Sequence, residues 1–393
     1  MYIDYGDEEK ALRAEVRAYC AELLPTGERH FLQGETRAPH DRQTIRQMGH
    51  DGWLGLSFPR EYGGQGRRLL DHYIFFDEAQ KAGAPISHVT LMTVAPALLS
   101  FGTSEQKREF LPRIMTGEIL FSIGYSEPEA GTDLASLRTS AVRDGDEYLI
   151  NGQKYFTSGG DTSDFIWLAA RTGSPDSRHE GISLFIVETA NPGYSFDPIE
   201  TLAPHQTNVT YYDNVRVPIS RRVGEENEGW RLITTQLNLE RLTMVMPSPV
   251  QALFAEVCDW ARTEHRADGR RVIDVPWVQL NLARVHTKLE ALKLLNWKTA
   301  WSASNEVLSP ADASVMKVYG SEFLVEAYRL LLEVIGARGY LKTSAPGAVL
   351  EAKLEKAYRG ATIKTFGGGV NEIQREIIAR SGLGVPSTPR RLG

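Results

Sequence analysis

The stretch FSIGYSEPEAGTDLASLRTSAVRDGDEYLINGQKYFTSGG, residues 121–160, decides the fold of this chain. It joins a loop rich in Ser, Gly and Asp to a run in which apolar residues surround the pair Asn151-Gly152. An Asn-Gly pair between short apolar runs is a strong signal of a β-hairpin turn. We therefore expect a hairpin at Asn151-Gly152 and a change to β structure near Ile119.

The residues after this stretch continue the β pattern. Three short β-rich runs follow, separated by Gly, Pro, Asn and Asp: DFIWLAART, GISLFIVE and TNVTYYDNVRVP. Their spacing is typical of a small antiparallel barrel or sandwich. The sequence thus predicts a middle β-domain over residues 119–226.

Both flanks of the β-domain have helical periodicity. Apolar residues recur at helical spacing in the first segment and in three later ones: Leu12, Val16, Tyr19 and Leu23; Leu253, Val257 and Trp260; Leu282, Val285, Leu289 and Leu292; and Phe323, Ala327, Leu330 and Val334, before Gly336. Such patterns predict amphipathic helices. We expect an α+β multidomain protein with an N-terminal helical domain (1–118), a middle antiparallel β-barrel and a C-terminal four-helix bundle (227–393).

Composition excludes several classes of function. The chain has 393 residues and a formal net charge of −6, with no long basic run, which argues against a nucleic-acid partner. Cys20 and Cys258 are its two cysteines and form no metal-binding motif, so no metal is expected. The acidic N-terminus does not read as a signal peptide, and no run of about 18 apolar residues predicts a membrane span. We expect a cytoplasmic bacterial protein.

Two segments of the opening stretch contain residues suited to binding. Small and hydroxyl residues around Pro128 and Gly131 expose backbone N–H groups that can cradle an anion or the edge of a flavin. Taken alone, this segment is also an ordinary polar loop. By itself, Phe156 in NGQKYFTSGG is expected to be a core residue rather than a stacking platform.

Together and in this order, YSEPEAGTD and the NGQK-F-TSGG pattern resemble the acyl-CoA dehydrogenase family. YDNVRVPISRRVGEENEGWRLITTQLNLERL is similar to the family's passage from the barrel into the C-terminal bundle, and the resemblance covers essentially the whole chain. It implies an FAD cofactor, an acyl-CoA substrate and α,β-desaturation of the thioester, with electron-transferring flavoprotein or oxygen as acceptor. Flavin chemistry of this kind needs the protein mainly for orientation and electrostatics.

The resemblance also assigns residues to the flavin. Those that would line its ring and phosphates are Ile123, Tyr125, Ser126, Gly131 and Thr132, and Thr132 would also contact the substrate. Phe156 matches an aromatic position against the ring, and Ser158 matches a hydroxyl near its N5 atom. Because Thr157 and Ser158 are adjacent hydroxyl residues, this last assignment is open by one position.

The catalytic base is expected at an unusual place. The reaction needs a Glu to remove the α-proton, and many family members carry it just before a sequence like IQR. Here Ile373-Gln374-Arg375 aligns with that sequence and places Gly368 at the Glu position. Isovaleryl-CoA dehydrogenase carries its Glu in a sequence like Leu-Glu-Arg-Leu, which is present here as residues 239–242. Glu240 is therefore the expected base, although an isolated LERL would otherwise be a solvated helix face.

Asn238 and Arg241 match positions around the thioester and CoA, and Gly368 matches a substrate position. Two further motifs depart from the family. Where typical homotetramers have an Arg-x-x-Phe-Gly-like motif, this chain has EHRADGRRVID, and Glu333 replaces a usual Gln. These elements normally complete the FAD site of a neighbouring subunit. The pattern resembles the heteromeric steroid side-chain acyl-CoA dehydrogenases of actinobacteria, so we expect a dimer or tetramer, with a second chain of this family in a heterotetramer.

Two alternative functions stay open at this point. A fold relative that uses reduced flavin and oxygen would be a monooxygenase or N-oxygenase, but such relatives tend to lack a base at both positions. A non-catalytic subunit of a heteromer would contain Glu240 without depending on it. Flavin reduction by an acyl-CoA distinguishes the first alternative, and a Glu240 variant distinguishes the second.

Overall fold

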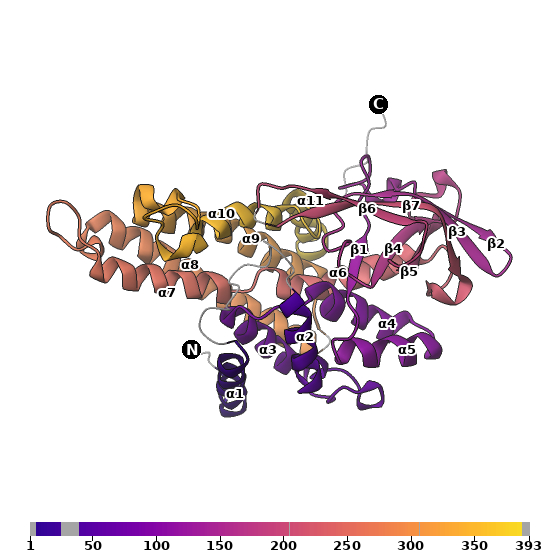
Figure 1. The fold of residues 1–393 in the computed structure, drawn as a ribbon, viewed down its shortest axis with the longest axis horizontal. Coiled ribbons are helices and arrows are strands. Elements are labelled where there is room, and N and C mark those ends of the chain that lie inside the picture. Colours follow the sequence, from indigo (N-terminus) through magenta and orange to yellow (C-terminus); the bar gives the residue numbers. More distant parts are fainter. Residues whose placement is uncertain (1–4, 25–38, 204, 306, 387–393) are drawn as a thin grey trace. The chain divides into compact units, whose positions relative to one another are not determined.

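The computed structural model describes residues 5–24, 39–203, 205–305 and 307–386, and Figure 1 shows its ribbon. Its helices are α1 (Asp7–Leu23), α2 (Pro39–His50), α3 (Leu69–Ala82), α4 (Ala95–Phe101), α5 (Ser104–Met115), α6 (Gly229–Met244), α7 (Ser248–Thr263), α8 (Pro276–Ser304), α9 (Pro310–Ile335), α10 (Lys353–Ala361) and α11 (Asn371–Ile377). Its strands are β1 (Phe121–Gly124), β2 (Ser140–Asp144), β3 (Glu147–Lys154), β4 (Phe165–Arg171), β5 (Ile182–Glu188), β6 (Tyr194–Ile199), β7 (Thr207–Pro218) and β8 (Arg222–Val223).

The chain forms two compact units that are not consecutive stretches of sequence. The helical unit contains residues Met1–Leu32, Leu69–Ala84 and Arg241–Gly393, and the sheet unit contains Gln33–Arg68 and Pro85–Glu240. Packing therefore joins α1 and α3 to the C-terminal helices. Helical regions before and after the sheet in sequence confirm the expected fold class.

In the helical unit, α1 is fixed to α3 by charge as well as by apolar contact. Leu12 and Val16 are buried, as their spacing predicted. The guanidinium groups of Arg13 and Arg17 each lie 2.6 Å from the Glu78 carboxylate, which is almost inaccessible to solvent. Burial alone would raise the pKa of Glu78, but the two arginines hold it below its usual value. A buried carboxylate is tolerated when it is paired in this way.

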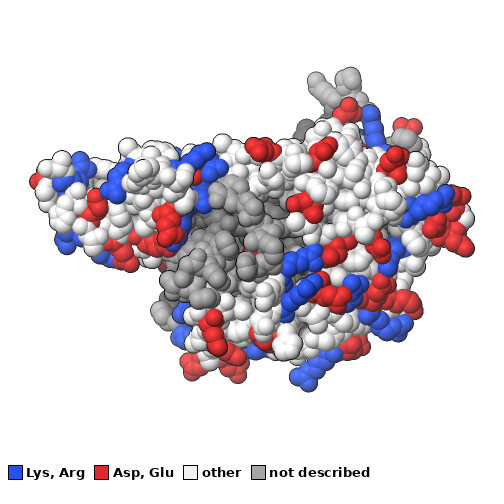
Figure 2. Space-filling view, viewed as in Figure 1, with Lys and Arg blue, Asp and Glu red and all other residues white. Residues whose placement is uncertain are grey.

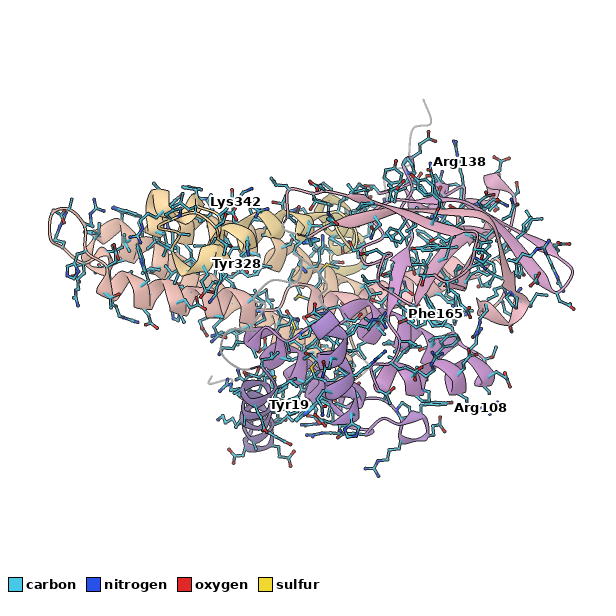
Figure 3. All side chains as sticks on the ribbon, in the orientation of Figure 1. Tyr19, Arg108, Arg138, Phe165, Tyr328 and Lys342 are labelled. Atoms are coloured by element: carbon cyan, nitrogen blue, oxygen red, sulfur yellow. The ribbon has the colours of Figure 1, made fainter. Side chains whose placement is uncertain are left out.

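The bundle of α7, α8 and α9 follows the predicted apolar stripes. The residues from those stripes that are buried in its core are Leu253, Val257, Leu282, Val285, Leu289, Leu292, Phe323, Ala327, Leu330 and Val334. Tyr328, labelled in Figure 3, is also buried in this core. Gly336 ends α9 with φ of 74°, a conformation that glycine adopts without strain.

The sheet unit is built on one eight-stranded sheet with the order β6-β7-β3-β2-β4-β5-β8, and β1 pairs with β4 off this path. All seven residues of β4 are buried, in agreement with its continuous apolar sequence. Most pairs are antiparallel, as expected, but β1 runs parallel to β4, from Phe121 opposite Phe165 to Gly124 opposite Leu168. The parallel pair arises because the β2–β3 hairpin separates the two strands in sequence.

The hairpin turn expected at Asn151-Gly152 was wrong. β3 continues through both residues, and the turn lies at Gly145-Asp146, between Asp144 and its partner Glu147. Asn151-Gly152 instead forms a bulge opposite β7, where the pairing register shifts. The Asn151 side chain accepts a hydrogen bond from the Asn214 backbone N–H (2.8 Å), so the long strand β7 supplies partners that sequence reasoning did not foresee.

Charges of both signs are interspersed on the face drawn in Figure 2. Several described surface charges form ion pairs, such as Arg113 with Glu118 (2.7 Å) and Arg216 with Asp144 (3.1 Å). Exposed pairs contribute only about 0–1 kcal/mol each. Stability therefore depends mainly on the two apolar cores.

Among the residues that the structure describes, no helix is both long and apolar enough to cross a membrane. Within the same residues, no group of three or more His, Cys, Asp or Glu side chains is arranged to hold a metal ion.

Candidate functional site

The loop of residues 125–139, which carries most of the expected flavin residues, is held by a buried ion pair. Lys154 Nζ lies 2.7 Å from Glu127 Oε1 and also donates to the Tyr125 carbonyl at 3.1 Å. The Glu127 carboxylate accepts from the backbone N–H groups of Arg138 (2.6 Å) and Thr139 (2.9 Å). Through this ion pair with Glu127, Lys154 at the end of β3 fixes both the start and the end of the loop.

Burial affects the two charges of this pair differently. The Lys154 side chain is fully buried, and burial lowers its pKa to about 8. Burial acts to raise the pKa of Glu127, but Lys154 and the donors around the carboxylate keep it below the usual value. The charged form of the pair is therefore favoured at neutral pH.

Arg171, at the end of β4, holds the middle of the same loop. Its buried guanidinium donates to the carbonyls of Ala135 (2.7 Å) and Leu137 (3.2 Å), in and after a short 3₁₀ turn. It also donates to the Arg178 carbonyl at 2.5 Å. Sequence analysis did not identify Arg171, Lys154 or Glu127 as important, because nothing in the pattern distinguishes these buried charges from surface ones.

The exposed part of the loop carries Gly131 and Thr132. Both are exposed, and a side chain built on Gly131 would meet no atom within 4 Å. The loop and β3 together line a cavity of about 290 Å³, with the lining residues Glu127, Pro128, Glu129, Ser136, Arg138, Thr139, Gly152 and Gln153. Arg138, labelled in Figure 3, pairs there with Glu129 at 3.1 Å. The loop therefore presents open space to a ligand.

Tyr125 directly follows β1 and is buried rather than exposed. Its hydroxyl accepts a hydrogen bond from Trp167 Nε1 at 3.1 Å and another from the Gln236 side-chain amide. Trp167 Nε1 also lies 3.1 Å from Gln236 Oε1. Gln236, on α6, was not identified from the sequence, although it lies one helical turn before Glu240. This contact fixes α6 to the sheet at that turn.

Phe156, Thr157 and Ser158 have distinct environments. Phe156 is 63% exposed and adopts φ of 62°, so the expectation that it is a core residue was wrong. Thr157 is fully buried, with its hydroxyl 3.1 Å from Thr210 Oγ1 and its backbone N–H bonded to Asn208. Ser158 is exposed. The buried Thr157 fixes the segment to β7, and this forces the ring of Phe156 outward.

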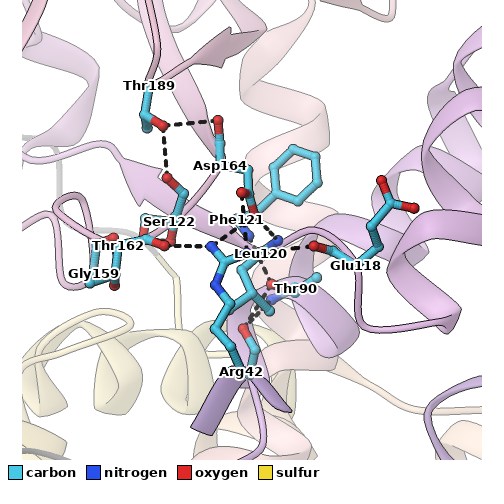
Figure 4. A network of polar contacts seen from close by, with 12 residues as sticks. Arg42, Thr90, Glu118, Leu120, Phe121, Ser122, Gly159, Thr162, Asp164 and Thr189 are labelled. Atoms are coloured by element: carbon cyan, nitrogen blue, oxygen red, sulfur yellow. Dashed lines mark hydrogen bonds and ion pairs between the residues drawn. The ribbon is translucent and has the colours of Figure 1, made fainter. Parts of the chain in front are cut away.

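A polar network fixes the backbone on either side of these residues (Figure 4). The Asp164 carboxylate pairs with Arg42 at 2.9 Å and accepts from the Leu120 backbone N–H at 2.8 Å. The Ser122 hydroxyl donates to the Ser158 carbonyl at 2.8 Å. In addition, the Tyr155 backbone N–H donates to the Ser126 carbonyl at 2.8 Å. The structure thus brings Ile123, which is half-buried on β1, and Ser126 together with the 156–158 segment.

The triple glycine Gly367-Gly368-Gly369 lies between α10 and α11 in the helical unit. Gly368 has φ of 66° and Gly369 has φ of 97°. A side chain on Gly369 would also lie 2.6 Å from Gln374 Nε2. Glu372, the nearest carboxylate in sequence, is exposed at the start of α11. The loop is therefore shaped by backbone conformations that favour glycine.

The chain matches three domain families over these regions. They are described as acyl-CoA dehydrogenase N-terminal domain (residues 6–118), middle domain (122–215) and C-terminal domain (227–383). Acyl-CoA dehydrogenase FadE26 of Mycobacterium tuberculosis is 52% identical, and the match covers 99% of this chain and all of that protein. The chain belongs to the acyl-CoA dehydrogenase family. The resemblance inferred from the sequence is confirmed.

Solved structures agree with this result. The ChsE4-ChsE5 complex of Mycobacterium tuberculosis contains a chain that is 52% identical, with a TM-score of 0.92, covering 99% of this chain and 100% of that one. The steroid ACAD Tcur3481-Tcur3483 matches with 46% identity and a TM-score of 0.93, over 99% of this chain and 100% of that one. This protein is an acyl-CoA dehydrogenase.

Several residues expected at the acyl-CoA dehydrogenase site remain predictions. The side chains of Asn238, Glu240 and Arg241 lie outside the described residues, although α6 is continuous through them.

Both departures from the family motifs occur in the described part of the helical unit. Glu333 accepts a hydrogen bond from Asn281 at 3.0 Å and pairs with Arg329.

In the segment EHRADGRRVID, the arginines pair within the segment itself. Arg270 lies 2.7 Å from the Asp268 carboxylate, and Arg271 lies 2.7 Å from Asp274. Arg266 lies 3.9 Å from Asp268. The acidic residues thus neutralise the local positive charge.

Proposed function

We propose that this acyl-CoA dehydrogenase is the base-bearing subunit of an FAD-dependent heteromer that desaturates a bulky, branched or steroid side-chain acyl-CoA. Glu240 removes the α-proton of the thioester, and the β-hydrogen leaves as hydride. The proposal rests on the family likeness, on the conformation of Gly368 and on the departures at Glu333 and in residues 264–274.

Gly368 is the observation that carries the assignment of the base. Its φ of 66° lies in the left-handed region, where an L-residue such as Glu costs about 1–2 kcal/mol more than glycine. A carboxylate at this position would therefore strain the loop. The LERL sequence of α6 then supplies the base, as in isovaleryl-CoA dehydrogenase.

The sheet unit has residues that fit an FAD. An exposed aromatic ring on a residue with positive φ is costly unless something covers it, and Phe156 meets both conditions. Ser158 is exposed beside it, which favours Ser158 over the buried Thr157 as the hydroxyl near N5. Gly131 and Thr132 leave open space for phosphates. FAD, when bound, supplies the hydride acceptor.

Proton removal is the task of this chain's own residues. The α-proton of a thioester is weakly acidic, so donors must stabilise the negative charge that develops on the carbonyl oxygen. Glu240 has to lie in an apolar, water-excluded position, where its pKa rises toward neutrality. Asn238 and Arg241 orient the thioester and CoA around it.

The test uses the complex co-expressed with its partner chain and a panel of linear, branched and steroid side-chain acyl-CoA thioesters. Glu240→Gln should slow anaerobic bleaching of the flavin by about 10²–10⁴-fold. Glu372→Gln is the matched control, because Glu372 is an exposed carboxylate close to the usual base position; it should change the rate less than twofold. Full activity of Glu240→Gln would refute the proposal and favour a non-catalytic role. No bleaching of the wild type by any thioester would favour the oxygenase alternative.

The heteromer is a separate part of the proposal. ChsE4-ChsE5 and Tcur3481-Tcur3483 each pair two chains. A carboxylate such as Glu333 facing a pyrophosphate is repulsive by about 1 kcal/mol or more when poorly hydrated. Asp268 likewise neutralises arginines that a neighbouring FAD would need. This subunit therefore completes its neighbour's site poorly and depends on a second chain.

Purification of the chain with and without its second chain tests whether it works as a heteromer. The chain expressed alone should carry little FAD, whereas the complex with its second chain should carry FAD in stoichiometric amounts and accept electrons from acyl-CoA for an electron-transferring flavoprotein in the cytoplasm. Absorbance at the flavin band and mass spectrometry of the intact assembly measure both. Full flavin in a homo-oligomer would contradict the heteromer while leaving Glu240 as the base.

A further inference from the structure

A fully buried lysine lies behind the triple glycine. Lys317, in the N-terminal third of α9, has no exposed surface. Its ammonium donates to the carbonyls of Gly369 (2.6 Å) and Thr365 (3.1 Å), and to the side-chain oxygen of Asn371 (2.7 Å). All three are oxygen acceptors, the kind of partner that an ammonium group needs when it is buried. A lysine without exposed surface is rare unless its charge is compensated.

The three acceptors lie on both sides of the glycine loop. Thr365 ends a 3₁₀ turn that continues α10, so its carbonyl lies at the negative end of a helix. Gly369 lies in the loop itself, and Asn371 is the first residue of α11. Lys317 therefore joins the end of one helix to the start of the next, across residues 366–370.

Asn371 is itself fixed to α9. Its side-chain amide donates to Ser321 Oγ at 3.0 Å and to Glu322 Oε1 at 3.1 Å. A second contact fixes α11 one turn later, where the Ser314 hydroxyl donates to Gln374 Oε1 at 2.9 Å. The start of α11 is thus fixed to α9 by contacts besides the one with Lys317, and the glycines directly precede it. Three consecutive glycines have more conformational freedom than any other residues.

We propose that Lys317 is a positioning residue that holds the loop of residues 366–370 in the conformation that receives the thioester end of the acyl-CoA. This inference rests on the proposed function, which assigns Gly368 to the substrate. The Gly369 and Thr365 carbonyls both accept from the ammonium, so the distance between the two ends of the loop is fixed. Without the ammonium, the carbonyls of Thr365 and Gly369 lose this buried donor, and the Asn371 side-chain oxygen keeps only the Ser321 hydroxyl at 3.3 Å.

The test compares Lys317→Met with the wild type in the co-expressed complex. Methionine keeps the length and apolar stem of lysine and removes only the donor. The variant should raise the hydrogen-exchange rate of a peptide covering residues 366–370 by about tenfold, the effect of unsatisfied buried acceptors. KM for the thioester that bleaches the flavin fastest should rise by a similar factor, whereas the affinity for free CoA and the flavin content should change less than twofold. Lys288→Met is the control, since Lys288 is a half-exposed lysine on α8 paired with Glu326.

Unchanged exchange and unchanged KM in Lys317→Met would overturn the inference. An equal loss of affinity for CoA and for the thioester would also overturn it, because it would show a purely structural role. If Lys317→Met does not fold, Lys317→Gln keeps a shorter, neutral donor that cannot serve all three acceptors; it should show the same pattern at a smaller size, and wild-type exchange in it would count against the proposal. The exchange measurement does not depend on turnover, so it separates this inference from a failure of Glu240 as the base.

Discussion

The loop of residues 125–139 is proposed to contact the flavin and the loop of residues 366–370 the thioester, and different forces fix the two loops. Buried charges hold the first: Glu127 and Lys154 form an ion pair, and Arg171 bonds to the loop carbonyls. The second has no side chain of its own at its three central positions, and its backbone adopts positive φ at Gly368 and Gly369. Side-chain charges thus fix the first loop, whereas the second depends on glycine backbone conformations and on hydrogen bonds from Lys317.

The largest expected effect comes from breaking the ion pair of the first loop. Lys154→Met leaves the Glu127 carboxylate buried without its cation, which typically costs about 3–5 kcal/mol of the free energy of unfolding. Chemical denaturation and the flavin content of the complex measure the effect. Arg138→Met is the control on the same loop, because Arg138 is 80% exposed and its ion pair with Glu129 is a surface one; its cost should stay below about 0.5 kcal/mol. Equal costs for the two variants would show that burial of the pair is unimportant.

The same ion pair predicts that the stability of the protein depends on pH. The pKa of Lys154 is lowered from 10.5 to about 8 in the folded protein. Between these pH values the unfolded chain binds more protons than the folded one, so stability rises with pH across this window. Below pH 8 both states carry the proton, so the cost of burying the charged lysine is fully present and does not change with pH. The free energy of unfolding of the wild type, relative to Lys154→Met, should therefore increase by a few kcal/mol from pH 8 to pH 10.5. A flat difference across this window would mean that Lys154 titrates normally.

The same contrast explains how much the sequence could predict. Helices such as α8 and α9 were predictable because an apolar stripe is a local pattern that tertiary packing reinforces. The prediction of a turn at Asn151-Gly152 was wrong because β7 offered β3 a longer pairing partner, and the turn formed at Gly145-Asp146. The exposure of Phe156 could not be predicted, since it depends on the distant contact between Thr157 and β7.

The residues of the candidate site also fall into those that the sequence could predict and those that it could not. Glu240 and Gly368 were assigned from motifs, whereas Lys154, Arg171 and Lys317 could not be identified because a single sequence does not show which charges are buried. Buried charges are set by contacts between residues far apart in the chain. Gln236 was missed for the same reason, although its position one turn before Glu240 was a usable signal.

The smallest expected effect compares one glycine from each loop. Gly369→Ala introduces a side chain at φ of 97° and within 2.6 Å of Gln374 Nε2, so it should cost about 1–2 kcal/mol of the free energy of unfolding. Gly131→Ala, in the first loop, has ordinary φ and no atom within 4 Å of the new methyl group, and should cost less than about 0.5 kcal/mol. Thermal or chemical denaturation of the two variants decides the comparison. A larger cost at Gly131 would mean that the first loop depends on glycine more than the second does. The buried charges of the first loop would then not be sufficient to explain its conformation.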